Sequence, residues 1–313
     1  MSLALLFPGQ GSQHVGMGRE LADAFSEVRA LFDEADDALG IDLSTIMWEG
    51  PDEVLTETRN AQPALLLHSV AAYRVMEARE AGLGSAAFVA GHSLGEFSAY
   101  VAADAIDFAD ALRAVRRRGE LMFESGQARP GTMAALLGLE DDQVEQVCES
   151  VDTGVCVPAN YNSPGQVVIS GDEPGVARGM EAAKEAGAKR AVPLNVSGAF
   201  HSPLMEGAES GLADFLDAIE IRDPAIPVIS NVTATPVTDA DTARELLVRQ
   251  LTSPVRWSRS IGYMVEQGVD RFVEFGPGRV LCGLNRRNAR GTDCTSIGTP
   301  EDVRAFTMGG EES

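Results

Sequence analysis

Short apolar runs alternate along the chain with longer segments of helical periodicity. Residues 3–7 and 86–90 are apolar runs that end at glycine-containing turns, which is typical of buried strands. Apolar residues recur at three- and four-residue steps over 19–39, 63–80 and 108–123, which predicts three helices. Strand, helix and strand in this order indicate right-handed βαβ units and therefore a mainly parallel sheet.

The middle of the chain has a different order of elements. The predicted order is strand, helix, two strands, helix and strand, at 133–139, 141–150, 155–158, 167–170, 174–186 and 190–194. This order is that of a ferredoxin-like unit. The alternation then resumes, with a helix from Leu204, a strand at 227–230, helices at 243–251 and 261–267, a strand at 271–275 and a last helix.

The fold class predicted from this pattern is α/β with two parts. Residues 1–125 and 197–313 form a large domain around the mainly parallel sheet. Residues 126–196 form a small ferredoxin-like subdomain inserted into it.

Composition and charge narrow the possible functions. The 47 acidic and 25 basic residues give a net charge of −22, which repels nucleic acids and anionic membranes, so we expect neither as a partner. The first ten residues lack the charged segment of a signal peptide, and no apolar run approaches the roughly 18 residues of a membrane span. The four cysteines form no C-x-x-C pair and the four histidines lie far apart. We therefore expect reduced thiols, no metal site and a cytoplasmic location.

The clearest chemical signal is Gly91-His92-Ser93-Leu94-Gly95, which follows a predicted strand and precedes a helix-forming run. A G-x-S-x-G motif in this context is typical of a nucleophile elbow, a tight turn that exposes the serine hydroxyl at a helix N-terminus. The backbone N–H of Leu94 would then face a developing oxyanion. The motif predicts Ser93 as a nucleophile.

A serine nucleophile needs a general base. His201 lies between a strand end and a helix start, where the sites of α/β sheets gather, so we predict it as the base. We expect His92 to pack beneath the turn, His68 to lie in the core and His14 to face solvent. The sequence shows no convincing acidic third member of a catalytic triad.

Three successive arginines, Arg116-Arg117-Arg118, follow the elbow. They are either a solvated helix face or a binding element. Successive helical residues point about 100° apart, so the three side chains cannot share one direction. An inward-facing arginine could bind a carboxylate through two charge-assisted hydrogen bonds.

Four motifs together resemble one protein family. They are Phe7-Pro8-Gly9-Gln10-Gly11-Ser12-Gln13, Gly91-His92-Ser93-Leu94-Gly95-Glu96, Ala199-Phe200-His201-Ser202 and Phe275-Gly276-Pro277-Gly278. Their order and spacing are similar to those of the malonyl-CoA:acyl-carrier-protein transacylases, over nearly the whole chain. The resemblance implies a hydrolase-like α/β domain with a ferredoxin-like insertion, in agreement with the pattern above.

The resemblance also implies roles for the residues of the reaction. Ser93 matches the acylated nucleophile and His201 matches its base. Gln10 matches the oxyanion hole, together with the N–H of Leu94. Gln250 matches the residue whose backbone carbonyl orients the histidine, a position that a hydrolase fills with Asp or Glu.

Further positions match the binding site of the acyl group. Arg118 matches the clamp on the malonyl carboxylate, and Gln62 matches a glutamine that lines the pocket. In related polyketide-synthase domains, residues like Phe200 and Leu94 accompany malonyl, so we expect malonyl to be preferred over methylmalonyl. We also expect two asparagines to shape the cleft, Asn162 and Asn231.

The implied activity is ping-pong transfer of malonyl from malonyl-CoA to the phosphopantetheine thiol of an acyl carrier protein, for fatty-acid synthesis. The resemblance implies no bound cofactor. Carrier proteins are acidic, so docking on this acidic chain needs a local basic rim. The candidates for that rim are Arg116, Arg117, Lys189, Arg190, Arg286, Arg287 and Arg290.

Three alternatives remain open at this point. A polyketide-synthase acyltransferase acting in trans would use the same chemistry with another carrier protein. A serine esterase would normally carry an acidic third residue and a glycine-rich oxyanion loop, and neither is visible. An inactive carrier-binding scaffold would not need Ser93, His201, Gln10 and Arg118 intact. The sequence leaves open the carrier protein, the range of acyl donors and the oligomeric state.

Overall fold

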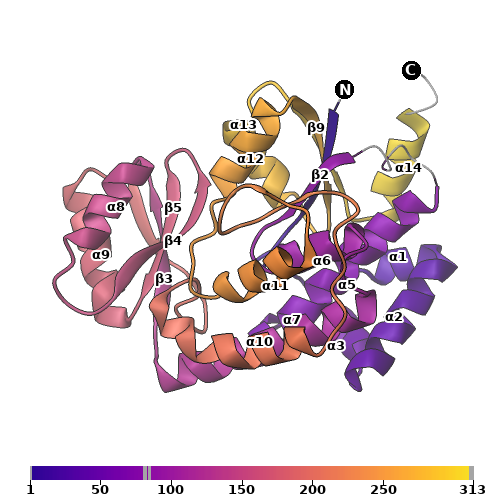
Figure 1. Cartoon of the computed structure of the whole chain (residues 1–313), viewed down its shortest axis with the longest axis horizontal. Coiled ribbons are helices and arrows are strands. Elements are labelled where there is room, and N and C mark those ends of the chain that lie inside the picture. Colours follow the sequence, from indigo (N-terminus) through magenta and orange to yellow (C-terminus); the bar gives the residue numbers. More distant parts are fainter. Residues whose placement is uncertain (1, 80–82, 84–85, 310–313) are drawn as a thin grey trace.

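The computed structural model describes residues 2–79, 83 and 86–309, in two sheets with helices around them (Figure 1). The larger sheet has six strands in the order β10-β9-β1-β2-β7-β8. These strands are β1 (Ser2–Phe7), β2 (Ala86–Gly91), β7 (Val228–Ile229), β8 (Pro236–Val237), β9 (Val269–Phe275) and β10 (Asp293–Ile297). Every neighbouring pair is parallel except β7 with β8, which confirms the predicted mainly parallel sheet.

The central strand β1 is apolar on both faces because helices cover both sides of the sheet. Leu3, Leu5 and Phe7 pack in the core that includes the helices N-terminal to the small sheet. Ala4 and Leu6 pack on the other side with residues of α12 and α13. The helices of this part are α1 (Arg19–Ala24), α2 (Ser26–Leu39), α3 (Leu43–Glu49), α4 (Asp52–Thr56), α5 (Thr58–Glu77), α6 (Gly95–Ala102), α7 (Phe108–Ala128), α10 (Glu209–Asp217), α11 (Ala240–Arg249), α12 (Trp257–Glu266), α13 (Val280–Asn288) and α14 (Pro300–Gly309).

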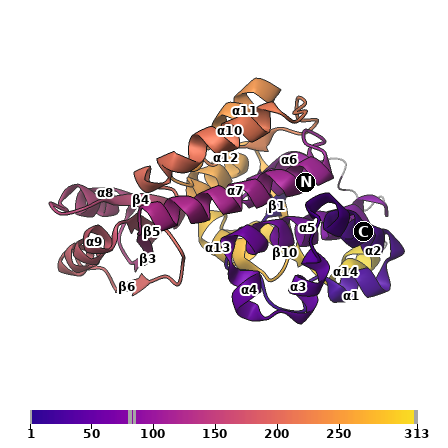
Figure 2. The ribbon, with the colours of Figure 1, turned by 90° about the horizontal axis from the view of Figure 1, so that it is seen from below.

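The smaller sheet is antiparallel and has the order β4-β5-β3-β6. Its elements are β3 (Thr132–Leu137), α8 (Asp141–Glu149), β4 (Cys156–Ser163), β5 (Gln166–Gly171), α9 (Glu173–Glu185) and β6 (Arg190–Pro193). This is the predicted β-α-β-β-α-β unit, with its own apolar core between the sheet and the two helices. Figure 2 shows α7 running along the molecule from the large sheet toward the small one. The domain boundaries at residues 126 and 196 stay a prediction.

Several predicted elements need correction. The single helix expected over 19–39 is two helices, because Phe25 between them adopts an extended conformation with φ −132° and ψ 116°. The helix expected from residue 204 begins with a 3₁₀ turn, Pro203–Ala208, before α10. The sequence pattern did not reveal α3, α4, β8, β10 and α14. Residue 80, the expected end of another helix, lies outside the described residues.

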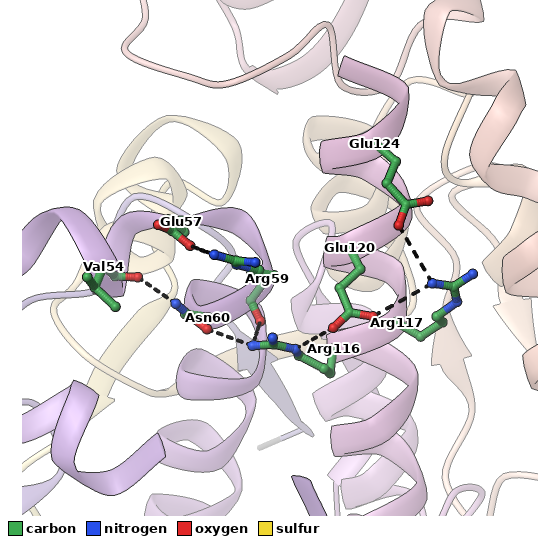
Figure 3. Close-up of polar contacts among 8 residues, drawn as sticks. All are labelled: Val54, Glu57, Arg59, Asn60, Arg116, Arg117, Glu120 and Glu124. Carbon is green, nitrogen blue, oxygen red and sulfur yellow. Dashed lines mark hydrogen bonds and ion pairs between the residues drawn. The ribbon is translucent and has the colours of Figure 1, made fainter. Parts of the chain in front are cut away.

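The expected helix 63–80 begins earlier, at Thr58, so Pro63 lies inside α5. Pro63 has no N–H, so it cannot bond the carbonyl of Arg59 four residues before it. Arg116 of α7 donates to that carbonyl from Nη1 at 3.2 Å and to Asn60 Oδ1 at 2.6 Å (Figure 3). The proline is therefore compatible with the helix because a side chain of another helix takes the missing donor's place.

This network changes the candidate docking rim. Besides its two α5 contacts, Arg116 donates from Nε to Glu120 at 2.7 Å, so its guanidinium is engaged within the chain. Arg117 is 40% exposed, and its ion pairs with the described residues are long, 3.7 Å to Glu120 and 4.0 Å to Glu124 (Figure 3). Arg116 is thus a structural contact between α5 and α7 rather than a free docking residue.

The expectation of reduced thiols is wrong for one pair of cysteines. Cys282 of α13 and Cys294 of β10 form a disulfide, with Cα atoms 5.4 Å apart. The two residues meet because α13 packs against the β9–β10 edge, which their spacing in sequence does not reveal. Cys148 and Cys156 are free and buried.

None of the described helices combines the length and apolar character that a membrane crossing requires.

Candidate active site

The turn between β2 and α6 places Ser93 in the left-handed region, at φ 51°. Such a conformation is strained for serine and is stable only where the surroundings fix it. The flanking glycines make the turn possible. A Cβ on Gly91 would lie 1.9 Å from the carbonyl carbon of Gly95, and a Cβ on Gly95 would lie 2.1 Å from the oxygen of Phe7. The sequence motif therefore folds as the elbow that was predicted.

Ser93 and His201 are in hydrogen-bond contact although 108 residues separate them, since Ser93 Oγ lies 2.8 Å from His201 Nε2. His201 Nδ1 lies 2.8 Å from the backbone oxygen of Gln250. A carbonyl oxygen only accepts, so Nδ1 carries the proton and Nε2 presents its lone pair to the serine hydroxyl. Burial, and then the charge of Arg118, lower the pKa of His201 to about 3. The histidine is therefore a neutral base at ordinary pH.

Arg118 is the inward-facing member of the arginine run and is fully buried. Its Nη1 donates to Gln62 Oε1 and its Nη2 to Gln250 Oε1, both at 2.8 Å. Nη2 also lies 3.3 Å from Ser93 Oγ. Burial lowers the pKa of Arg118 to about 10, so the guanidinium stays charged at neutral pH. Two neutral amide oxygens hold this cation next to the nucleophile, an arrangement suited to a ligand carboxylate.

A cleft of about 680 Å³ opens onto Ser93 and His201. Gln10, in the loop after β1, and Phe200 also line it. Gln62 Nε2 donates to Gln10 Oε1 at 3.3 Å, which links the arginine site to that loop. Leu94 lies directly after the nucleophile, at the N-terminal end of α6. The N–H groups of a helix N-terminus favour negative charge.

Two asparagines support the elbow. Asn231 Oδ1 accepts from the backbone N–H of Ser93 at 2.6 Å, and its Nδ2 donates to the oxygen of Gly91 at 2.6 Å. Asn162 Oδ1 lies 2.8 Å from Nε2 of His92, whose ring packs 5.5 Å from that of Trp257. Both asparagines thus act on the turn itself, a more specific position than the cleft-shaping one expected from the sequence.

The other histidines lie where the sequence suggested. His92 packs beside the turn, His68 is buried with Nε2 at 2.9 Å from the oxygen of Gly298, and His14 is exposed. Glu96 is a site residue that the sequence did not reveal; it is fully buried on α6 and accepts from Gln250 Nε2 at 2.5 Å. Its position directly after the elbow glycine was visible, but its contact across 154 residues was not.

The buried histidines predict a loss of stability in acid. Burial lowers the pKa of His68 to about 4, whereas the unfolded chain titrates near 6.5. Below pH 6.5 the unfolded chain therefore binds a proton that the folded chain does not. We expect the free energy of unfolding to fall with decreasing pH between 6.5 and 4, by a slope that approaches about 1.4 kcal/mol per pH unit for this histidine.

Urea unfolding of the wild type and of His68→Gln across this pH range measures the effect. Glutamine keeps a donor toward Gly298 and does not titrate, so the variant should lose less stability in acid than the wild type. Parallel slopes for the two proteins would contradict the assignment of a neutral His68.

No three His, Cys, Asp or Glu side chains are placed to hold a metal ion anywhere in the described ranges.

Comparisons with known proteins show what the whole chain is similar to. The family model for the acyl transferase domain matches residues 4–308. The malonyl CoA-acyl carrier protein transacylases of Bacillus subtilis and Escherichia coli K12 are 48% and 46% identical to this chain over 303 residues. These alignments span 96% of this chain and 95% and 97% of the two relatives. A solved malonyl-transacylase in complex with its type II PKS acyl-carrier protein superposes with a TM-score of 0.95 at 42% identity, over 99% of this chain and 100% of that one.

Proposed function

This chain belongs to the acyl transferase domain family, and on that premise we propose that it transfers malonyl from malonyl-CoA to the phosphopantetheine thiol of an acyl carrier protein, in fatty-acid synthesis. One observation carries the chemistry. Ser93 Oγ lies 2.8 Å from the basic nitrogen of His201 and 3.3 Å from the buried guanidinium of Arg118. A nucleophile, its base and a cation for the acyl carboxylate therefore meet at one atom.

In the first half-reaction, Ser93 Oγ attacks the thioester carbonyl carbon of malonyl-CoA while His201 Nε2 takes the hydroxyl proton. The oxyanion is stabilised by Gln10 and the N–H of Leu94. Collapse of the tetrahedral intermediate breaks the carbon–sulfur bond, and His201 returns the proton to the CoA thiolate. The product is a malonyl ester of Ser93.

In the second half-reaction, the carrier protein's thiol attacks this ester and gives its proton to His201. The serine oxygen leaves and takes the proton back, so the enzyme returns to its starting state. The reaction is ping-pong. Every step uses groups of the chain and its substrates, and we propose no bound cofactor.

The charge of Arg118 links substrate choice to catalysis. This charge depresses the pKa of His201, second only to burial. A malonyl carboxylate bound to Arg118 offsets the charge, so the base becomes stronger when a carboxylated acyl group is present. An acyl group without a carboxylate leaves His201 weak.

Phe200 predicts the preference between acyl donors. Its ring is 7% exposed and lines the cleft beside His201, where an α-methyl branch would have to fit. One methyl group changes discrimination by roughly 10- to 200-fold, so we expect malonyl-CoA to load at least about tenfold faster than methylmalonyl-CoA. Phe200→Ala should reduce this ratio. Rates of CoA release with the two donors measure it, and equal turnover in the wild type would contradict the prediction.

Carrier-protein docking is predicted at the C-terminal end of α13. Arg286, Arg287 and Arg290 are exposed there on a strongly acidic chain. Steering by surface charge changes association by tenfold or more, so we expect Arg286→Glu/Arg287→Glu to raise the KM for the carrier protein about tenfold. Loading from malonyl-CoA should stay unchanged. Arg19→Glu/Arg304→Glu is the control, since it makes the same change of net charge at two exposed arginines outside the candidate rim. Equal loss of loading and transfer in the α13 variant would refute docking there.

The proposal is tested by following labelled malonyl from malonyl-CoA to a holo carrier protein. Transfer to the carrier thiol at a rate far above release of free malonate is expected. Release of malonate alone would indicate the serine esterase alternative. That alternative is disfavoured because the partner of His201 Nδ1 is a backbone carbonyl rather than a carboxylate.

A role in polyketide synthesis is the second candidate, because the solved relative is bound to a type II PKS carrier protein. Parallel assays with fatty-acid and polyketide carrier proteins separate the two. A cytoplasmic location stays a prediction, and the disulfide removes one of the observations on which it rested.

A further inference from the structure

Glu96 is a buried carboxylate that no step of the proposed reaction uses. Its Oε2 accepts from Gln250 Nε2 at 2.5 Å and from the backbone N–H of Asn231 at 3.3 Å. Its Oε1 is buried and contacts no polar partner among the described residues. A fully buried carboxylate is unfavourable unless its contacts compensate, so these two contacts define what Glu96 does.

Both contacts lead to the reacting groups. The Gln250 amide that Glu96 holds presents its Oε1 to Arg118 Nη2 at 2.8 Å, and its Nε2 also donates to the oxygen of Ser93 at 3.0 Å. The backbone N–H of Asn231 donates to Glu96, and the side chain of Asn231 accepts from the N–H of Ser93. Glu96 therefore reaches Arg118 through Gln250 and reaches Ser93 through Asn231.

The orientation of the Gln250 amide decides the state of Arg118. With the amide oxygen toward the guanidinium, donor meets acceptor. Rotated by 180°, the amide NH₂ would face the guanidinium NH₂, and two donors would oppose each other between two fully buried side chains. Glu96 Oε2 is the closest acceptor for the amide NH₂, so it favours the productive orientation.

We propose that Glu96 is a positioning residue that fixes the Gln250 amide with its oxygen toward Arg118 and so orients the guanidinium for the carboxylate of the acyl group. The inference rests on the proposed function. The hydrogen-bond partners of Arg118 among the described residues are the amide oxygens of Gln62 and Gln250 and the hydroxyl of Ser93. All three are uncharged, which leaves the direct ion-pair position to the substrate. Burial raises the pKa of Glu96 to about 7, and both of its partners are donors, so an accepting oxygen rather than a charge is what the contacts require.

Three variants separate the accepting oxygen from the charge. Glu96→Gln keeps an oxygen at the same reach and removes the charge. Glu96→Asp keeps a carboxyl group but withdraws it by one methylene, beyond contact with Gln250. Glu96→Met keeps the length and removes the acceptor. For each, loading by malonyl-CoA and by acetyl-CoA is measured as kcat/KM for CoA release, together with urea unfolding to establish that the protein is folded.

We expect Glu96→Asp and Glu96→Met to lose malonyl loading by about 30-fold and acetyl loading by less than about threefold, because acetyl does not use Arg118. Glu96→Gln should stay within about fivefold of the wild type with both donors. If Glu96→Met does not fold, the Asp and Gln variants decide the matter alone.

Two outcomes would overturn the inference: equal losses with both donors, which indicate a merely structural role, or a Gln variant as impaired as the Asp variant. The wild-type rates distinguish failure of the proposed function from failure of the inference. A wild type that loads malonyl no better than acetyl refutes the proposed function and the inference with it, whereas a selective wild type with unselective losses refutes only the inference.

Discussion

Replacing Arg118 with methionine should lower malonyl loading by about 10²- to 10³-fold, because the acyl carboxylate loses its buried partner. Loading by acetyl-CoA should be unchanged or faster, since removal of the Arg118 charge raises the pKa of His201. Methionine fills a similar apolar volume but leaves the buried oxygens of Gln62 and Gln250 without their donor, so urea unfolding of the variant is measured beside its activity. The kcat/KM values for CoA release from the two donors measure the change.

Arg117→Met is the matched control for this variant. Arg117 precedes Arg118 on α7 but is 40% exposed, and its ion pairs in the described part of the chain are 3.7 Å and 4.0 Å long. The control should load both donors as the wild type does. Equal losses of malonyl and acetyl loading in Arg118→Met would mean that the arginine supports the elbow rather than the acyl carboxylate.

Replacing His201 with alanine should lower loading from every acyl donor by about 10³-fold, within the range typical of general acid–base catalysis. The loss falls on kcat rather than on KM, because the histidine moves a proton and does not bind the acyl chain. Single-turnover formation of the acyl-enzyme measures it directly.

His68→Gln is the comparison for this second variant, since His68 is also buried but lies outside the cleft lining. It should load malonyl normally at neutral pH. A His201→Ala enzyme that retains more than about a tenth of wild-type loading would show that another group takes the proton from Ser93, and the Gln250–His201 contact would then have only a structural meaning.

The parts of the site that could be predicted from the sequence are those with local causes. The elbow follows from glycines whose added Cβ atoms would collide with Gly95 and Phe7, and such steric demands are written into a five-residue motif. The strand-and-helix alternation likewise follows from local apolar periodicity. It predicted the four strands of the small sheet and the strands β1, β2, β7 and β9 of the large one, but not the edge strands β8 and β10. The inward direction of one arginine follows from helical geometry, although which of the three faces inward came from the family resemblance.

The parts that could not be predicted depend on contacts between distant segments. Glu96 meets Asn231 across 135 residues, and Cys282 meets Cys294 only because α13 packs against β10. The predicted helix begins too late, at residue 63. The donor that bonds the backbone carbonyl of Arg59 comes from Arg116, on another helix, and the local sequence does not show it. Propensity placed a helix start at the proline, and a tertiary hydrogen bond allowed the helix to begin earlier.

The acidic composition also gave an incomplete picture of the surface. The sequence offers seven basic residues as docking candidates. It does not distinguish an exposed side chain from one that is hydrogen-bonded within the chain. Arg116 contacts three partners within the chain, whereas Arg286 and Arg287 are exposed at the end of α13. Docking is therefore better sought at α13 than at the arginine run of α7.

The most direct test of a malonyl-enzyme on Ser93 is intact-protein mass spectrometry after brief mixing with malonyl-CoA, on the wild type and on Ser93→Ala. The expected result is a single malonyl adduct on the wild type only, which disappears when holo carrier protein is added. An adduct on Ser93→Ala, or a wild type that transfers malonyl to the carrier without ever carrying an adduct, would contradict the serine-based ping-pong mechanism.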